Sequence, residues 1–141
     1  MKISDSLRKA RRSRNLSQEK LSTKSGVALK SIMFYEEGRQ IPRLQNALYL
    51  ADTLDMSLQE LITGTPAPYK RKILSLEDIG LTVDKYIMQP DICITTLCQN
   101  VKINHDTIYR IRRGTVNSMI DKYLILADYL GLTLDELVGR V

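Results

Sequence analysis

Apolar residues recur every three to four positions along most of this 141-residue chain. Ile3, Leu7 and Ala10, near the start, fall on one face of a helix, and Leu44 and Leu48 do the same further along. This spacing is that of an amphipathic α-helix. No stretch shows the sustained alternation and hairpin turns that are typical of β-strands. The pattern therefore predicts an all-α protein.

Capping residues and glycines divide the first half into five predicted helices. Ser, Thr, Asp and Asn are favoured just before a helix, and Gly just after it. The first predicted helix ends near Asn15, and the second is capped by Ser17 and broken at Gly26-Val27. The third runs from about Leu29 to Glu37 and is closed by Gly38, and the fourth follows Pro42 and runs to about Leu54. The fifth opens with the capping box Ser57-x-x-Glu60 and stops at Gly64.

The second half of the chain repeats the first. A shift of 76 positions superposes them without a gap, so that Gly38 meets Gly114. Residues 48–54 and 124–130 then share the pattern Leu-x-Leu-Ala-Asp-x-Leu. A repeat of this length is too long for one unit of a solenoid. It indicates two copies of one small five-helix domain.

We therefore expect domains over residues 1–64 and 76–141, joined by a short linker over residues 65–75. The linker contains two prolines and a basic cluster without an apolar period, which is typical of an exposed connection. The second domain has its own signals for helix ends. Its fourth helix is predicted to end at Gly131, and helix starts are predicted at Ser75-x-x-Asp78, Asn104, Ser118-x-x-Asp121 and Thr133-x-x-Glu136.

The net charge of +5 is unevenly distributed. Residues 1–64 carry +4, residues 65–76 carry +3 and residues 77–141 carry −2. A basic region attracts polyanions and supplies sequence-independent affinity for phosphate. The same charges can also serve only to keep the surface soluble, and charge alone does not separate these alternatives.

Cysteine and histidine content argues against a metal site. Cys93 and Cys98 are five positions apart, a spacing that suits neither a disulfide nor a Cys-x-x-Cys clamp, and His105 is the single histidine. We expect both cysteines to be buried, reduced thiols. No run of eighteen apolar residues and no signal sequence follows Met1-Lys2, so a cytoplasmic protein is expected.

A family resemblance rests on several motifs in the first half. They are the Leu16-Ser17-Gln18-Glu19-Lys20-Leu21 opening, Gly26-Val27, Ser31-Ile32, Tyr35-Glu36-x-Gly38, Pro42, Leu48-x-Leu50-Ala51 and Leu58-x-Glu60-Leu61-Ile62. Together they resemble the phage repressor, Cro/C1-type (XRE-like) helix-turn-helix family. The resemblance implies tandem repressor-like domains whose third helix enters the major groove of double-stranded DNA.

The resemblance also implies roles for residues around that helix. Gln18 corresponds to the family's phosphate-contacting glutamine, and Arg39 and Arg43 are placed for phosphate or minor-groove contact. The alternative is an exposed helix-start residue for Gln18 and exposed, solubilising side chains for the two arginines. Arg11 and Glu36 match an internal salt bridge of the family. In the second copy these two positions become Ile87 and Arg112, which predicts that the bridge is lost there.

The expected reading residues differ between the two copies. The first copy offers Lys30 and Ser31 as polar readers, while Met33 and Phe34 offer only apolar contacts and could instead form a patch for a protein partner. The second copy is richer in polar readers, but Ile94 replaces the phosphate-contacting glutamine, so a dimerisation or effector module is the alternative there. The residues expected to contact DNA are Ser17, Gln18, Ala28, Leu29, Lys30, Ser31, Phe34, Arg39, Arg43, Asn104, His105, Asp106, Tyr109, Arg110 and Arg113.

The function predicted from these features is that of a sequence-specific DNA-binding transcriptional regulator, acting as a repressor. The alternative is a protein-interaction module, such as an antitoxin-like or anti-repressor partner. No phosphate-binding glycine loop, nucleophile elbow or metal-ligand motif is present, so neither an enzyme nor a cofactor is expected.

Two modes of pairing stay open at the level of sequence. The two copies of one chain could pair and read an asymmetric site, since the linker is long enough to reach adjacent half-sites. Alternatively, two chains could pair through the apolar faces of their fifth helices and read a palindrome. Those faces would be formed by Leu58 and Ile62 or by Leu134 and Val138.

Overall fold

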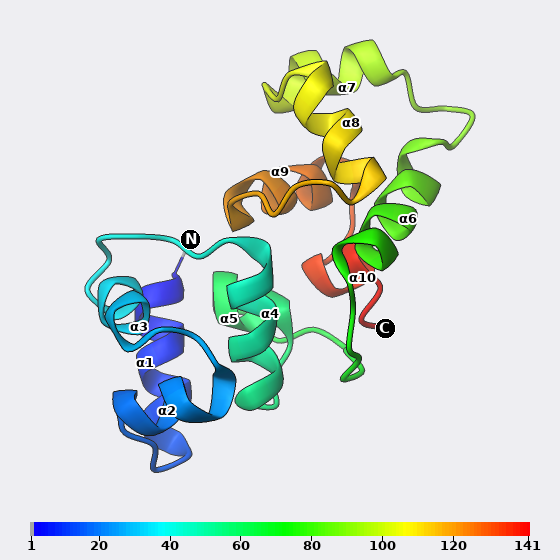
Figure 1. The fold of residues 1–141 in the computed structure, drawn as a ribbon. Coiled ribbons are helices and arrows are strands. Elements are labelled where there is room, and N and C mark those ends of the chain that lie inside the picture. The colour runs from blue at the N-terminus through cyan, green and yellow to red at the C-terminus, as the bar shows by residue number, and fades with distance from the viewer. Residues whose placement is uncertain (1) are drawn as a thin grey trace.

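The computed structural model describes residues 2–141, and within that range the chain forms ten α-helices and no strand (Figure 1). The prediction of an all-α protein is confirmed. The helices are α1 (Ile3–Ser13), α2 (Gln18–Ser25), α3 (Leu29–Glu36), α4 (Leu44–Thr53), α5 (Leu58–Thr63), α6 (Leu76–Ile87), α7 (Ile94–Val101), α8 (His105–Arg113), α9 (Ile120–Leu130) and α10 (Leu134–Val138).

Most predicted helix ends are confirmed by the cap geometry. The Ser17 hydroxyl accepts a hydrogen bond from the amide of Lys20 at the start of α2, and Gly26 ends that helix with a φ of 78°. The side chain of Asn104 caps α8 in the same way as Ser17 caps α2. Complete capping boxes open α6 at Ser75 and α10 at Thr133. Local sequence therefore determines these helix starts.

Two capping predictions were wrong. The predicted box Ser118-x-x-Asp121 does not form, because α9 begins one residue later with Met119 at its N-cap and without a side-chain cap. Ser118 is instead buried at the contact between the two halves of the chain. At α5 the Ser57 hydroxyl accepts from the amide of Glu60, but the return bond of a capping box is not formed.

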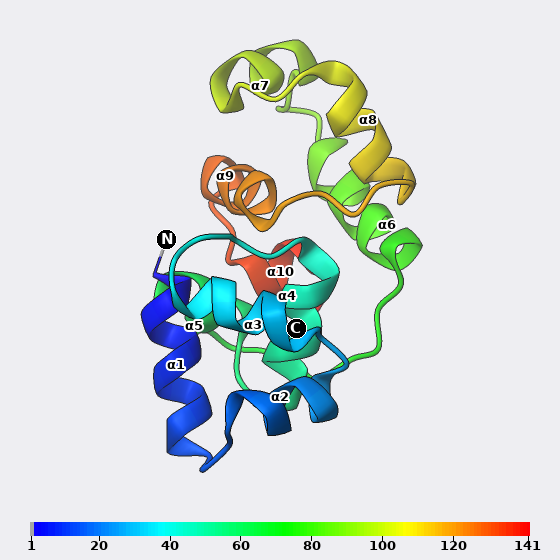
Figure 2. The ribbon, with the colours of Figure 1, turned by 60° about the vertical axis from the view of Figure 1, so that its left-hand side comes forward.

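The first half packs α1 against α3 and α5, and α2 against α3 and α4. Leu7, Leu21 and Ile32, on three successive helices, are fully buried in its core, and Tyr35 is almost fully buried. Figure 2 shows α2 and α3 on the near side of this bundle. The core therefore fixes the angle between the second and third helices.

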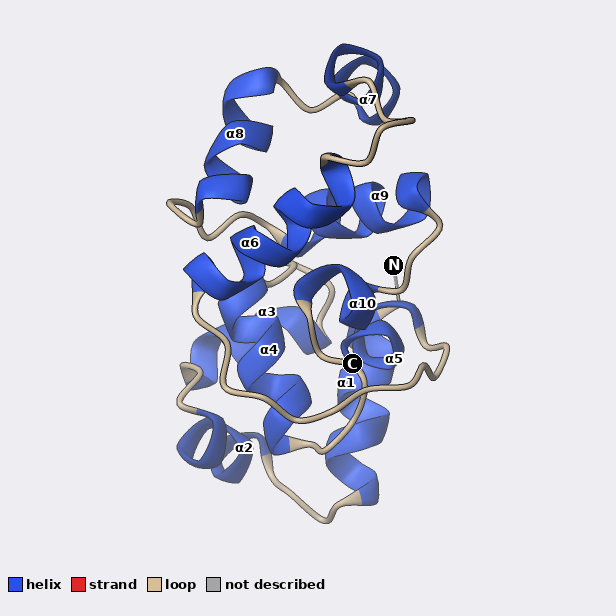
Figure 3. Ribbon diagram, turned by 90° about the vertical axis from the view of Figure 1, so that its right-hand side faces the viewer, coloured by secondary structure: helices blue, strands red, loops and turns tan. Residues whose placement is uncertain are grey.

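The second half is built around the contact of α6 with α8 and α10. The backbones of α6 and α8 approach closely where Gly80 meets the end of α8. A Cβ at Gly80 would lie 2.7 Å from the carbonyl oxygen of Arg112, and one at Gly114 would lie 2.6 Å from the Cα of Glu77. Glycine is therefore needed on both sides of this crossing. Figure 3 shows α6 and α8 with the loops that connect them to α7 and α9.

The two halves join at two places, the first of which lies between α4 and α9. The amide of Leu44 donates to the carbonyl oxygen of Ser118 at 2.9 Å, and the amide of Ile120 donates to that of Pro42 at 3.0 Å. Leu44 and Ile120 occupy equivalent positions in the 76-residue repeat, as do Pro42 and Ser118. The two hydrogen bonds therefore form a reciprocal pair.

The second junction lies between α5 and α10. The carboxylate of Asp135 accepts hydrogen bonds from the amides of Leu58 at 2.9 Å and Gln59 at 3.0 Å. In return, the amide of Leu134 donates to Oε1 of Gln59 at 2.8 Å. Besides its own cap, each of these short helices therefore receives a further N-terminal hydrogen-bond partner from the other half of the chain.

Arg140 strengthens this junction from the C-terminal end. Its guanidinium is fully buried and pairs with Asp135 within its own half and with Asp52 across the junction, each at 2.8 Å. It also donates to the carbonyl oxygen of Met56, and the ring of Tyr69 lies 5.0 Å from the guanidinium carbon. Its Nε finds no hydrogen-bond acceptor among residues 2–141.

The apolar faces of α5 and α10 are buried by these contacts. One alternative from the sequence used these faces for contact between two chains. The four residues named for it are all completely inaccessible within one chain: Leu58, Ile62, Leu134 and Val138. These four residues therefore cannot form an exposed apolar face that binds a second chain.

Residues 65–75 lack helix, as expected of the connection, but this segment is not uniformly exposed. The Tyr69 hydroxyl donates to Asp55 at 2.9 Å, and Lys72 Nζ donates to the carbonyl oxygens of Gly139 and Val141. The connection is thus held against both halves. Across residues 2–141, none of the helices is long and apolar enough to cross a bilayer.

Candidate nucleic-acid interface

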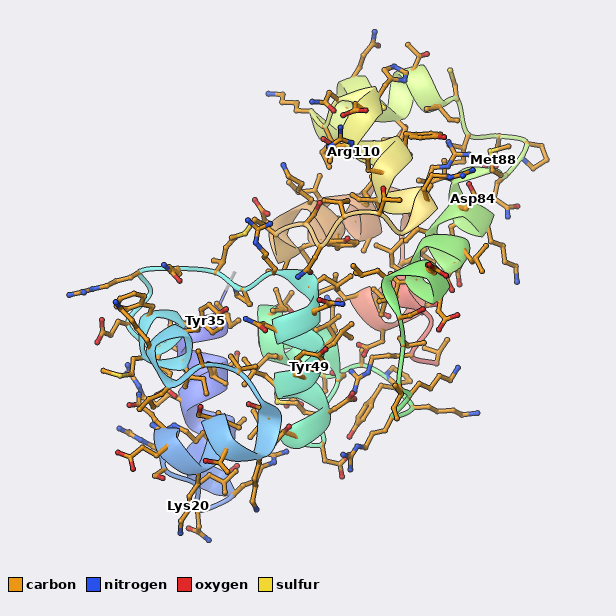
Figure 4. All side chains as sticks on the ribbon, viewed as in Figure 1. Lys20, Tyr35, Tyr49, Asp84, Met88 and Arg110 are labelled. Atoms are coloured by element: carbon orange, nitrogen blue, oxygen red, sulfur yellow. The ribbon has the colours of Figure 1, made fainter. Side chains whose placement is uncertain are left out.

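The start of α2, where phosphate contact was predicted, is a capped and solvent-accessible helix N-terminus. Ser17 is exposed and occupies the N-cap, and Gln18 is half-buried in the first turn. The free amides of this turn point outward from a helix N-terminus, which favours an anionic oxygen. Lys20, in the same turn, projects from the edge of the molecule (Figure 4). This end of α2 therefore combines hydrogen-bond donors with one basic and one acidic side chain, Lys20 and Glu19.

The start of α3 is open to solvent. Ala28 and Lys30 are exposed, whereas Leu29, Ser31 and Phe34 are half-buried. The opposite face of the helix turns Ile32 and Tyr35 into the core, as predicted. Ala28 has no side chain that could cap the helix, so the first turn is held only through its backbone.

Two cations flank Phe34 on this face. Lys30 Nζ lies 5.6 Å from the ring centroid, and the guanidinium carbon of Arg39 lies 5.7 Å from it. Arg39 also pairs with Glu37 at 3.0 Å, in an exposed contact that solvent screens. The ring of Phe34 therefore lies beside two positive charges at the surface of α3.

The internal ion pair between α1 and α3 is confirmed. Arg11 holds Glu36 through two hydrogen bonds, from Nε at 2.8 Å and from Nη2 at 2.9 Å, and its Nη1 donates to the carbonyl oxygen of Leu16. Glu36 is almost fully buried. The hydrogen bond to Glu36 is the main cause that raises the pKa of Arg11. The pair fixes α3 against α1 and takes no part in the exposed face.

The counterpart of the Arg11–Glu36 bridge is absent from the second half, as predicted, but a different ion pair forms there. Ile87 is buried and apolar, but Arg112 pairs instead with Asp84 on α6, at 2.7 Å. Figure 4 labels Asp84 and Met88, whose sulfur accepts a further hydrogen bond from Arg112. Asp84 and Arg112 are equivalent to Arg8 and Glu36, which also contact each other, at 3.6 Å. The pairing is therefore retained with its charges exchanged.

The sequence contained a signal for this exchange that we did not use. Arg8 is replaced by Asp84, and Glu36 by Arg112, so both charges reverse at positions that face each other across two helices. The compensation lies in the weaker Arg8–Glu36 pair and not in the closer Arg11–Glu36 pair.

The outer face of α8 carries the polar residues that were expected there. His105, Asp106 and Tyr109 are exposed, as is Asn104 at the N-cap. Two arginines lie among them. Arg110 pairs with Asp106 at 3.2 Å in an exposed contact within the helix. The guanidinium carbon of Arg113 lies 5.7 Å from the ring centroid of Tyr109. The face is therefore charged and rich in donors.

The start of α7 differs from that of α2. Ile94 is half-buried where α2 has Gln18, and the N-cap is Cys93, without a side-chain cap. The prediction that both cysteines are buried was wrong for Cys93, which is exposed, and right for Cys98. Hydrogen bonding to Thr96 lowers the pKa of the Cys93 thiol. The described residues contain no group of three or more His, Cys, Asp and Glu side chains that could hold a metal ion.

Arg43 lies at the junction rather than on the open face. It forms an antiparallel bridge with Met119, the equivalent residue of the repeat, and its guanidinium donates to the carbonyl oxygen of Asn117 at 2.9 Å. The side chain is exposed but already has this partner. A shallow pocket beside it is lined by Tyr35, Arg39 and Met119, among others. Arg43 thus connects the end of the α3 loop to the second half.

Comparison with known proteins supports the assignment of the first half. Residues 7–61 match the family model described as helix-turn-helix, which spans most of α1 and all of α2 to α4. These residues form a Cro/C1-type helix-turn-helix domain, as the resemblance predicts. The match ends before α6, so a second copy over residues 76–141 stays a prediction.

One curated relative is the cryptic phage CTXphi transcriptional repressor RstR of Vibrio cholerae, which is 34% identical over 61 residues. The aligned region covers 43% of this chain and 54% of the relative, so the chain spans about half the length of the protein that it matches. No solved structure matches the chain.

Proposed function

We propose that this chain is a sequence-specific double-stranded DNA-binding transcriptional regulator that inserts α3 into the major groove. The observation that carries the proposal is the open first turn of α3 beside the N-terminus of α2, within a helix-turn-helix domain. The groove is about 12 Å wide and admits one helix. The main contacts between the halves run through α4, α5, α9 and α10, which leaves this face uncovered.

Each exposed group has a chemical role in this arrangement. The amide side chain of Gln18 and the free amides after Ser17 donate to a phosphate and set the orientation of the domain. Lys30 donates to guanine, and Ser31 donates to a base or a phosphate. The ring of Phe34 packs against a thymine methyl group, while Arg39 beside it neutralises phosphate.

Residues 76–141 form the second, divergent helix-turn-helix domain in this proposal, and residues 65–75 form the linker. The reciprocal hydrogen bonds at both junctions support it, because they join positions that are equivalent in the repeat. The order of the five helices in the second half follows that of the first. Repression, rather than activation, is inferred from the similarity to RstR, which is a transcriptional repressor.

The proposal is tested by fluorescence anisotropy with the full chain and labelled duplexes. Affinity should fall by about 0.9 log unit per log unit of salt for each phosphate that is neutralised. Lys30→Ala should weaken binding and relax one base preference, whereas Arg39→Ala should weaken binding on all sequences alike. Lys9→Ala is the matched control, since Lys9 is an exposed lysine of α1 outside the proposed face.

The second candidate is a protein-interaction module of the antitoxin or anti-repressor kind. It is favoured by the exposed side chain of Met33, 38% of which is accessible, on the same helix as Phe34. Such an apolar patch can also bind a protein. A chain that binds no duplex at low salt would contradict the DNA-binding proposal and favour this one.

A further inference from the structure

The two halves are related by an approximate two-fold rotation. Leu44 bonds to Ser118 as Ile120 bonds to Pro42, and Arg43 forms its bridge with its own equivalent, Met119. In a two-fold interface every contact occurs twice. Where two residues meet across it, the residues equivalent to them meet as well. The rotation axis therefore passes beside Arg43 and Met119.

The second junction, between α5 and α10, shows the same reciprocal pairing of equivalent residues. Leu58 donates to Asp135, and its equivalent Leu134 donates to Gln59, the equivalent of Asp135. Helices α4 and α9 are also equivalent and touch, as are α5 and α10. A single chain thus contains an interface of the kind that normally joins two identical subunits.

This symmetry places α3 and α8 on the same side of the molecule. A rotation moves an element around its axis but does not shift it along that axis. Equivalent helices therefore lie at the same level along the two-fold axis. The end of α3 lies at the Arg43 end of the axis, because Tyr35 and Gly38 line one pocket with Arg43 and Met119. Its counterpart α8 must lie at the same end. Figure 1 shows the two helices on opposite sides of the central pair α4 and α9.

The two helices present unlike chemistry at equivalent positions. Lys30 corresponds to Asp106, so a donor with a positive charge is replaced by an acceptor with a negative charge. Phe34 corresponds to Arg110, so an apolar ring is replaced by a guanidinium. A base pair that suits one helix does not suit the other at the same position.

Several contacts favour pairing within one chain over pairing of two first halves from different chains. Two first halves would place one Arg43 against another on the axis, where Met119 now lies. They would also lack Asp135 at the start of α5 and Arg140 beside Asp52. The covalent connection adds an effective concentration of the order of millimolar.

We propose that one chain binds DNA as a monomer and reads an asymmetric site, with α3 on one half-site and α8 on an unlike second half-site. The inference rests on the proposed DNA-binding function and adds a second reading surface, formed by His105, Asp106, Tyr109, Arg110 and Arg113. The two half-sites are separated by about one turn of DNA, roughly 34 Å, on one face of the duplex.

The test is selection of duplexes by the full chain from a random pool, followed by sedimentation of the selected complex. Two unlike half-sites and one chain per duplex are expected. Arg110→Ala should weaken binding by about tenfold and relax preference only in one half-site, whereas Lys30→Ala should relax preference only in the other. Lys85→Ala, at the position equivalent to Lys9, is the control with the same change in charge.

The outcomes separate this inference from the function on which it rests. A palindromic site that holds two chains would overturn the inference, and so would a single half-site that is insensitive to Arg110→Ala. Both results would leave the proposed DNA binding through α3 intact. Absence of binding to any duplex at low salt would overturn the proposed function itself.

Discussion

Asp135 and Gln59 occupy equivalent positions in the two halves, and each one's side chain accepts hydrogen bonds from the start of the other's helix. The exchange joins α5 and α10, whose six and five residues are too few to be stable as isolated helices. The buried guanidinium of Arg140 balances the charge of Asp135. Stability of the junction and formation of these helices are therefore coupled.

Replacement of Asp135 should test this coupling. Asp135→Ala removes the acceptor for two amides of α5 and leaves the guanidinium of Arg140 buried with one carboxylate fewer. Breaking a buried ion pair in this way costs about 3–5 kcal/mol. Urea unfolding followed by circular dichroism should show this loss, while Asp128→Ala, at an exposed position of α9, should change the free energy of unfolding little. Equal effects of the two substitutions would contradict the role of Asp135.

The ion pair between Asp84 and Arg112 should tolerate an exchange of its two charges. Asp84→Arg sets two arginines together on α6 and α8 and should cost about 0.5–1 kcal/mol, since the pair is partly exposed to solvent. Adding Arg112→Glu recreates the polarity of Arg8 and Glu36 and should recover most of the loss. A double-mutant cycle from urea unfolding measures the coupling. A strictly additive cycle would show that the two charges do not interact.

Close packing at Gly80 should make this position intolerant of a larger residue. Gly80→Ala places a Cβ against backbone carbonyl oxygens at the end of α8, which cannot move as freely as a side chain. We expect a loss of about 1–3 kcal/mol. Thermal unfolding should separate it from Leu81→Ala, which truncates an exposed neighbour on the same helix. A neutral Gly80→Ala would mean that α6 and α8 can separate without cost.

Substitutions at the N-caps should act in opposite directions on α3 and α8. Ala28→Asn supplies α3 with a side-chain oxygen for the amide of Ser31, as Asn104 already does for the amide of Thr107 on α8. The substitution should stabilise the protein by about 1 kcal/mol, and Asn104→Ala should destabilise it by a similar amount. Amide hydrogen exchange in the first turns of α3 and α8 provides the local measurement. Slower exchange in α3 is expected only for Ala28→Asn.

Most of the local architecture was predictable from sequence, because helix ends depend on residues a few positions apart. Ser17, Asn104 and the glycines at helix C-termini were placed correctly for this reason. The inward face of α3, with Ile32 and Tyr35, followed from the apolar period. Exposure of Lys30 on the opposite face follows from the same period, which is why the candidate reading residues could be named.

Predictions failed where long-range contacts replaced local ones. The carbonyl of Ser118 is engaged by an amide that is 74 residues away in sequence, and α9 begins after it. The hydrogen bond from Arg43 to Asn117 across the junction was likewise not predicted, while its expected contact with phosphate or the minor groove stays a prediction. A local pattern holds no information about which groups of the other half will lie nearby.

The sequence by itself determined the ten helices, their buried faces and the repeat that relates the halves, because periodicity and capping are properties of neighbouring residues. Only the tertiary structure decided how the halves meet. The reciprocal bonds between α4 and α9, the exchange of caps between Gln59 and Asp135 and the burial of Arg140 all join residues more than seventy positions apart or depend on that joining. Such contacts arise from complementary shape and charge in three dimensions, which the order of residues along the chain does not display.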